Sequence, residues 1–342
     1  MPITIKDIAR QADVSHSTVS RALNGSRLIS EETADRIRQV AADLGYMPSA
    51  AARTLKTNRS RALGVIIRNV DDPFFSEILQ GIEEVAQGHG YSLFMAASRQ
   101  DEKMEKNNIQ AMVERRVEGV IICSTPVSPT QSRQLTSFGV PIVVVNNQAA
   151  EAYRYSIYHD DRDGSHSLTH HLLELGHRRI AFLGNASAER SSHDRLVGFE
   201  QAMQSAGVVI PPWFIHQAPA GRPEHGQQAV EHFLAFADRP TAIVCYNDMI
   251  ALGVLQGLRI KGLQVPQDVS VTGFDNIFFS AYTDPPLTTF DQPKRYIGAE
   301  AARLVLELLD AGGTDGAQPE IHMLKGRLLV RSSTAAPPIE NS

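Results

Sequence analysis

From Arg61 onward the chain alternates between short apolar runs and segments with helical periodicity, and this alternation restricts the fold more than any other feature. The first series has apolar runs at 62–67, 91–95, 120–123 and 141–145 and helical patterns at 76–88, 102–116 and 129–138. The second series has apolar runs at 180–183, 242–245 and 269–273 and helical patterns at 192–206, 226–237 and 248–261. Repeated strand–helix units predict parallel sheets with helices on both faces. The sequence therefore predicts an α/β fold of two lobes, with a ligand cleft at the carboxyl ends of the strands.

The charge of the chain is unevenly distributed along its 342 residues, a length that predicts more than one domain. Residues 1–61 hold ten Lys and Arg against six Asp and Glu, a net charge of +4. Because the whole chain has a net charge of −5, the remainder carries −5 − 4 = −9. A basic N-terminal segment on an acidic body indicates a small domain that binds a polyanion.

Neither the hydrophobicity nor the cysteines indicate a membrane or secreted protein. No apolar run is long enough to cross a bilayer, and the N-terminus has no apolar signal core, so we expect a soluble cytoplasmic protein. Cys123 and Cys245 each end an apolar run. We therefore expect buried, reduced thiols and no disulfide.

Three short helical patterns follow one another at the N-terminus. Thr4 and Asp7 have the spacing of a capping box, Ser15 is a suitable N-cap for the second helix, and Ser30 is one for the third. Gly45 is a suitable residue to end the third helix. Two short helices joined by a tight turn and backed by a third predict an all-α helix-turn-helix domain.

The second of these helices carries polar residues near its start, on the side opposite its apolar residues. They are His16, Ser17, Thr18 and Arg21. Short hydrogen-bonding side chains and an arginine at a helix N-terminus suit base edges in the major groove and nearby phosphates. A solvated polar face is the alternative that this helix alone leaves open.

The segments Ile3–Ala9, Val14–Asn24 and Gly45–Lys56 resemble the headpiece and hinge helix of the lactose/purine repressor (LacI/GalR) family. The resemblance implies that His16, Ser17 and Arg21 read bases. It further implies that several residues lie near phosphates, namely Thr4, Ser15, Ser20, Asn24 and Arg27. Residues 16 and 17 differ from the corresponding pairs of the lactose and purine repressors, so no operator sequence can be transferred.

The hinge segment should act as a switch. Residues 49–57 follow Pro48 and would form a helix of less than three turns, which is marginal in water and should fold only against its twin on DNA. The resemblance implies that Leu55 inserts into the minor groove at the operator centre. Lys56, beside it, is a further candidate for contact with DNA. Packing of Leu55 against the twin helix is the alternative.

The body of the chain resembles the periplasmic-binding-protein-like sensor of the same family. The motifs that carry this resemblance include Asp72–Phe75, Tyr246–Asp248, Val265–Asp275 and Pro286–Pro293. The resemblance covers residues 3–333 and implies that the chain crosses between lobes near residues 161, 291 and 322. The implied division is a headpiece at 1–47, a hinge at 48–60, a first lobe at 61–161 with 292–322, and a second lobe at 162–291 with 323–342.

Polar and aromatic residues near the ends of the predicted strands form the candidate effector pocket. Carboxylates, amides and an arginine can bind vicinal hydroxyls, and aromatic rings cover the apolar face of a sugar. The candidates are Asp72, Phe74, Phe75, Asn146, Arg195, Asn247 and Asp275. Of these, we expect Arg195 to open a helix on the other side of the cleft. The resemblance adds Gln292. A cap or turn role is the alternative for each Asp and Asn. If the loop aligns without gaps, Gly221 replaces an aromatic residue that the lactose and purine repressors place over their ligand, which favours a small sugar or sugar derivative over a purine.

Other motifs do not support an enzyme or a metalloprotein. His166 and His170 are four residues apart, but they lack the glutamate of a zinc-protease helix. Residues 191–194 contain triad residue types without a nucleophile elbow. The glycines of 312–316 follow a helix rather than join a strand to a helix. We therefore expect no cofactor, no metal and no catalytic site.

These observations predict a ligand-controlled repressor that binds a near-palindromic DNA operator as a homodimer. Residues 332–342 carry no leucine heptads, which favours a dimer over a tetramer. An enzyme that uses the cleft carboxylates is a second interpretation, and the headpiece argues against it. A DNA-bending protein without a ligand is a third, and the polar, aromatic cleft argues against that.

Overall fold

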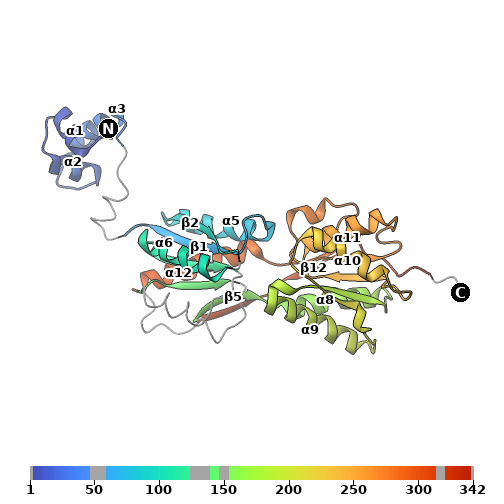
Figure 1. Cartoon of the computed structure of the whole chain (residues 1–342). Coiled ribbons are helices and arrows are strands. Elements are labelled where there is room, and N and C mark those ends of the chain that lie inside the picture. Colours follow the sequence, from blue (N-terminus) through green and yellow to red (C-terminus); the bar gives the residue numbers. More distant parts are fainter. Residues whose placement is uncertain are drawn as a thin grey trace. The chain divides into compact units, whose positions relative to one another are not determined.

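The computed structural model describes residues 3–46, 59–99, 101–123, 139–145, 154–312 and 320–339, and Figure 1 traces the chain. The chain divides into two compact units, Met1–Ser60 and Arg61–Ser342. Across the described ranges, no helix combines the length and the apolar character that a membrane span requires.

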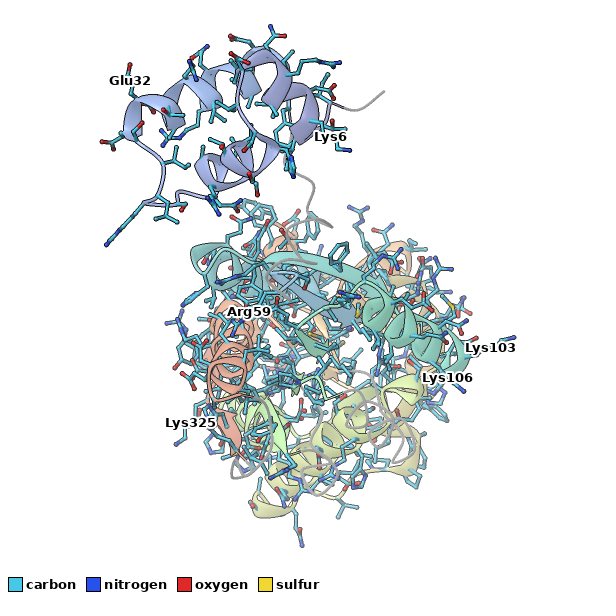
Figure 2. The ribbon with its side chains drawn as sticks, turned by 90° about the vertical axis from the view of Figure 1, so that its left-hand side faces the viewer. Lys6, Glu32, Arg59, Lys103, Lys106 and Lys325 are labelled. Carbon is cyan, nitrogen blue, oxygen red and sulfur yellow. The ribbon has the colours of Figure 1, made fainter. Side chains whose placement is uncertain are left out.

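The first unit is a bundle of three helices. They are α1 (Ile5–Gln11), α2 (His16–Leu23) and α3 (Glu31–Asp43). Ile8, Val19 and Ile37, one from each helix, are completely buried and form the centre of its core. The predicted helix-turn-helix domain is confirmed. Figure 2 shows the side chains of Lys6 and Glu32 extending outward from this bundle.

The predicted caps position these helices. The Thr4 backbone N–H donates to Asp7 Oδ2 at 3.0 Å. Ser15 Oγ accepts the N–H of Thr18 at 3.1 Å and so begins α2. Ser30 begins α3 in the same way, at a longer distance of 3.4 Å. Each cap binds an N–H group that the helix itself leaves without a partner.

The first lobe of the second unit is built on a parallel sheet in the order β11-β5-β4-β3-β1-β2. Its strands are β1 (Ala62–Ile67), β2 (Ser92–Ala97), β3 (Gly119–Cys123), β4 (Ile142–Val145), β5 (Tyr155–His159) and β11 (Glu320–Leu324). Its described helices are α5 (Pro73–Gly88), α6 (Glu102–Glu114) and α12 (Lys294–Asp310). Helix α12, orange-red in Figure 1, packs against α5 although the two lie far apart in sequence. Lys103 and Lys106 extend from α6 into solvent (Figure 2).

The second lobe repeats this architecture around a four-stranded parallel sheet in the order β7-β6-β8-β9. Its strands are β6 (Ile180–Asn185), β7 (Ile215–Ala218), β8 (Ala242–Cys245) and β9 (Ser270–Thr272). Its helices are α8 (Asp161–Glu174), α9 (Glu189–Ser205), α10 (Pro223–Leu234) and α11 (Asp248–Ile260). β10 (Thr289–Asp291) and β12 (Arg327–Leu329) form a separate antiparallel pair. The predicted α/β fold with two lobes and parallel sheets is confirmed.

Several predicted boundaries differ from the structure. β11 continues to Leu324, which pairs with His159 in β5, so the first-lobe sheet extends beyond the predicted crossing near 322. Helix α9 begins at Glu189 rather than at 192, so Arg195 lies in its second turn and does not open it. The predicted helix at 129–138 lies outside the described residues. Strands β5, β7, β10, β11 and β12 were not predicted from the sequence, and α12 was expected only as the helix before residues 312–316.

Both cysteines are buried and free, which confirms the prediction of reduced thiols. Cys123 ends β3 and Cys245 ends β8. Burial raises the pKa of the Cys123 thiol to about 12 and that of Cys245 further. Both side chains therefore stay neutral and serve as small apolar core residues.

Candidate functional site

A cavity of about 940 Å³ lies between the two lobes of the second unit. The segments that follow β1, β6, β8 and β9 line it, as expected for the carboxyl ends of parallel strands. Six of the predicted effector residues line this cavity: Asp72, Phe74, Phe75, Arg195, Asn247 and Asp275. Gln292 does not line it, and Asn146 lies outside the described residues.

Arg195 is the central charged group of the cavity and is only 5% exposed. Its Nε donates to Asp161 Oδ1 at 2.6 Å, and its Nη1 donates to the carbonyl of Tyr246. Its Nη2 lies 3.8 Å from Asp275 Oδ1. Asp161 therefore neutralises the guanidinium, and the other contacts aim it toward the cavity.

Two aromatic rings hold the plane of this guanidinium. Arg195 Cζ lies 3.7 Å from the centre of the Phe274 ring and 4.4 Å from that of Tyr246. Such stacking favours arginine in a desolvated site. The orientation of Arg195 is thus set by the protein before any ligand binds, which lowers the entropy cost of binding.

Asp275 faces Arg195 from the loop after β9, with a backbone φ of +114° that is rare for a residue with a side chain. Gln292 Nε2 donates to its Oδ1 at 2.6 Å. Burial raises the pKa of Asp275 well above its ordinary value, while the nearby Arg195 opposes that shift. Gln292 contacts Asp275 rather than the cavity, so the geometry gives it a positioning role.

Asp72 and Asn247 each cap the N-terminus of a helix and also line the cavity. Asp72 Oδ1 accepts the N–H of Phe74 at 3.0 Å and begins α5. Asn247 Oδ1 accepts the N–H of Ile250 at 2.9 Å and begins α11. The cap role considered as an alternative is therefore realised for both residues, yet both still line the cavity. Burial raises the pKa of Asp72, and the hydrogen bond from Phe74 opposes this.

Several lining residues were missed by the sequence reasoning. They are Arg68, His159, Asp161, Asn185, Ser191, Tyr246 and Arg222. Arg68, Asn185 and Tyr246 lie at or just after the end of a strand, so the rule that identified Asp275 could have found them. Asp161 gave no signal except its place near a lobe crossing. Burial lowers the pKa of His159, which keeps that imidazole neutral.

Polar contacts join the two lobes around the cavity. Arg222 Nη2 of the second lobe lies 3.0 Å from Asp71 Oδ2 of the first. Lys294, at the start of α12 in the first lobe, donates to the carbonyls of Asp275 at 2.5 Å and Asn276 at 3.0 Å in the second lobe. A change in the angle between the lobes would therefore alter hydrogen bonds next to Asp275.

The face of α2 predicted to meet DNA is accessible. His16, Ser17 and Arg21 are exposed, whereas Thr18 is half-buried with its hydroxyl 2.8 Å from Ser15 Oγ. Of the residues predicted near phosphates, Ser20 is half-buried and the others are exposed: Thr4, Ser15, Asn24 and Arg27. The Asn24 side chain donates to the Ser20 carbonyl at the end of α2. Leu55 and Lys56 lie outside the described residues.

The histidine pair on α8 does not form a metal cluster with its neighbours. The rings of His166 and His170 stack with centres 6.0 Å apart. Within the described ranges, no three His, Cys, Asp or Glu side chains gather as metal ligands would. On α8, His170 is exposed and His166 is partly buried.

Comparison with known families matches two parts of the chain. Residues 4–49 match the family described as bacterial regulatory proteins, lacI family, and residues 169–334 match a periplasmic binding protein-like domain. The HTH-type transcriptional repressor PurR of Haemophilus influenzae (strain PittEE) is 34% identical over 304 residues, which are 89% of this chain and 90% of that protein. The HTH-type transcriptional repressor CytR of Escherichia coli (strain K12) is 33% identical over 335 residues, which are 98% of this chain and 97% of that protein.

Solved structures of regulators have the same fold. The lac repressor dimer bound to operator and the anti-inducer ONPF has a TM-score of 0.87 at 27% identity, covering 98% of this chain and 100% of that one. A LacI family transcriptional regulator from Enterococcus faecium with bound ribose has a TM-score of 0.71 at 28% identity, covering 80% of this chain and 99% of that one.

Proposed function

Because the chain belongs to the lacI family of bacterial regulatory proteins, whose members are DNA-binding transcriptional repressors and not enzymes, we propose that a small sugar or sugar derivative in its cavity controls operator binding. Two copies of the chain would bind a near-palindromic operator together. The proposed site of action is the cytoplasm, where such DNA lies.

The arrangement around Arg195 carries this proposal. The Arg195 guanidinium and the Asp275 carboxyl, 3.8 Å apart, place a hydrogen-bond donor beside an acceptor, a combination that can bind neighbouring hydroxyls. Phe74 and Phe75, with ring centres 5.2 Å apart at an interplanar angle of 80°, supply an apolar wall. Rigid polar groups beside an aromatic wall are typical of a sugar site.

Two further observations favour a carbohydrate over a flat base. Gly221 lines the cavity and places no aromatic ring over a ligand. The similar regulator from Enterococcus faecium holds ribose. A sugar that contacts both Arg195 in the second lobe and the Phe74 wall in the first would stabilise one closure angle of the lobes. Such coupling between two sites typically amounts to about 1–3 kcal/mol.

The headpiece would read the operator through α2. We assign base contacts to His16, Ser17 and Arg21, and phosphate contacts to the residues around them. Thr18 is a weaker candidate for DNA because its hydroxyl already contacts Ser15 Oγ. The minor-groove role of Leu55 and the contact of Lys56 remain predictions from the sequence.

Effector control is tested on an operator obtained by in vitro selection with the full chain. Fluorescence anisotropy would measure operator affinity with sugars, sugar acids, sugar phosphates and purines in turn. A carbohydrate should change the affinity of the wild type, and Asp275→Asn should bind operator normally without responding. A response only to purines, or an unaltered response in Asp275→Asn, would contradict the proposed pocket.

The DNA contact is tested with a matched pair of arginine variants. Arg21→Ala should weaken operator binding about 5- to 150-fold, the range expected for a base-reading arginine worth about 1–3 kcal/mol. Arg36→Ala removes the same charge from exposed α3 and should have a small effect. Equal losses in the two variants would show that only net charge matters. Analytical ultracentrifugation of the complex should give two chains per operator.

A further inference from the structure

One corner of the cavity carries basic and hydrogen-bonding groups that a neutral sugar does not require. This corner, here named the α9 corner, consists of Arg68, Asn185, Ser187, Arg190, Ser191 and Tyr246, all of which line the cavity. Arg68 Nη1 of the first lobe donates to the Ser187 carbonyl of the second lobe at 3.4 Å. The hydroxyls of Ser191 and Tyr246 lie 2.9 Å apart. The corner therefore brings together two lobes and several donors.

Positive charge at the α9 corner is incompletely compensated. Arg190 Nε lies 2.9 Å from Asp194 Oδ2, but Asp194 also accepts two bonds from Arg162, at 2.9 and 2.8 Å. One buried carboxylate thus serves two guanidinium groups. Because Asp194 is shared with Arg162, which does not line the cavity, the positive charge of Arg190 at the cavity wall is only partly offset, and this part of the wall favours an anion.

The start of α9 adds to this charge. Ser187 and Ala188 line the cavity, and the 17-residue helix begins directly after them, at Glu189. Ala188 is its N-cap and has no side chain to bind the first N–H groups. The positive end of the helix dipole therefore borders the cavity, where an anion would be stabilised.

Asn185 supplies an independent sign of a ligand. It is 3% exposed, and its Oδ1 accepts the backbone N–H and the hydroxyl of Ser187 at 3.1 and 2.9 Å. Its Nδ2 donates to no group in the described part of the chain. A β-carbon at residue 221 would lie 2.9 Å from this nitrogen, so Gly221 is what leaves the Asn185 amide room to face the cavity. A donor on a side chain this buried, with its amide nitrogen open toward the cavity, would be satisfied by an acceptor of the ligand.

Most acidic groups of the cavity are engaged elsewhere. Asp161 pairs with Arg195, Asp71 pairs with Arg222, and Asp72 caps α5. Asp275 accepts a hydrogen bond from Gln292 and lies 3.8 Å from Arg195. Glu224 is exposed. None of these contacts neutralises Arg190.

We propose that the α9 corner binds an anionic group of the effector, a phosphate or a carboxylate, so that the effector is an acidic sugar derivative such as a sugar phosphate. This inference rests on the proposed function of the cavity as the effector pocket. Arg68 would approach the anion from the first lobe and Arg190 from the second. The anion would then link the two lobes directly.

Inorganic phosphate is the direct probe of this corner. The full chain would be titrated with sodium phosphate and with sodium chloride at equal ionic strength, and unfolding would be followed by a thermal shift. Phosphate should raise the melting temperature beyond the effect of chloride. Calorimetric titrations with ribose against ribose 5-phosphate, glucose against glucose 6-phosphate, and glucose against gluconate would then distinguish a phosphate from a carboxylate.

Arginine variants locate the anion. Arg68→Gln and Arg190→Gln should each weaken the binding of phosphate and of the preferred acidic sugar about tenfold or more, because each removes one charge-assisted hydrogen bond. The affinity of each variant for a neutral sugar should stay within about threefold of the wild-type affinity. Arg259→Gln removes the same charge from the exposed end of α11 and should change neither. Because the Arg190 side chain is exposed, Arg190→Gln should fold normally, and circular dichroism would check this.

The inference is overturned if phosphate acts no differently from chloride, if neutral and acidic sugars bind equally, or if Arg190→Gln and Arg259→Gln behave alike. These failures are distinct from failure of the proposed function. If a neutral sugar releases the operator while phosphate does not bind, only the anion subsite is wrong. If phosphate binds at the corner and no sugar or acidic sugar alters operator affinity, the effector role is wrong and the subsite stands.

Discussion

Replacing Asp248 by asparagine should change how the stability of the second lobe depends on pH. Asp248 is completely buried at the start of α11. Its Oδ1 accepts the Thr289 hydroxyl at 2.6 Å and its Oδ2 accepts the Ile277 N–H at 2.8 Å, so it ties α11 to β10 and to the loop that carries Asp275. Burial raises its pKa from 3.8 to about 7, against the opposing effect of these hydrogen bonds.

The sign and size of the effect follow from this shift. Since the folded protein holds the Asp248 proton more tightly than the unfolded chain, the stabilisation is fully present below pH 3.8 and is lost as the pH rises through about 7. At about 1.36 kcal/mol for each unit of pKa, the loss between pH 5 and pH 8 is about 3 kcal/mol. An asparagine can keep both contacts, with its oxygen toward Ile277 and its nitrogen toward Thr289, but it cannot ionise.

Urea unfolding at several pH values from 5 to 8 measures this difference. Trp213, the single tryptophan of the chain, adjoins β7, so its fluorescence reports on the second lobe. The free energy of unfolding of Asp248→Asn should rise relative to the wild type by about 3 kcal/mol from pH 5 to pH 8. The exposed Asp310→Asn should follow the wild type at every pH. If Asp248→Asn also ran parallel to the wild type, the raised pKa and the reasoning from burial would be refuted.

Three further substitutions test packing and the contacts between lobes by urea or thermal unfolding. Gly253→Ala would place a β-carbon 1.8 Å from the Pro223 carbonyl oxygen and should destabilise the second unit by about 1–3 kcal/mol or more. Gly88→Ala is the control, because a β-carbon there would have no atom within 4 Å and should not destabilise the protein. Equal effects of the two substitutions would contradict close packing of α10 on α11. Ile37→Ala should cost the headpiece about 2–4 kcal/mol and weaken operator binding, with sugar binding unchanged. Lys294→Met leaves two second-lobe carbonyls without their donor and should cost about 2–4 kcal/mol, so a neutral result would argue against this contact between the lobes.

The parts of the protein that depend on local physical chemistry were predictable from the sequence. Ser15 and Ser30 begin helices because a hydroxyl that binds a helix N–H needs only neighbouring residues. Strands β1, β3 and β8 are buried along their whole length, so they stand out as continuous apolar runs.

Elements whose stability depends on distant partners were not predictable. β11 has a half-exposed, mixed sequence and exists because it pairs with β5, more than 150 residues earlier in the chain. β7 is a short edge strand whose residues are mostly only partly buried. Neither pattern is apolar enough to distinguish a strand from a loop.

The same division applies to the cavity. The sequence by itself determined that polar residues such as Asn247 and Asp275 follow strands, because the carboxyl ends of parallel strands meet at one edge. Only the tertiary structure decided that Asp161 neutralises Arg195 and that Gln292 holds Asp275. Arg195 follows Asp161 by 34 residues and Gln292 follows Asp275 by 17, so only the folded chain brings these side chains together and buries them.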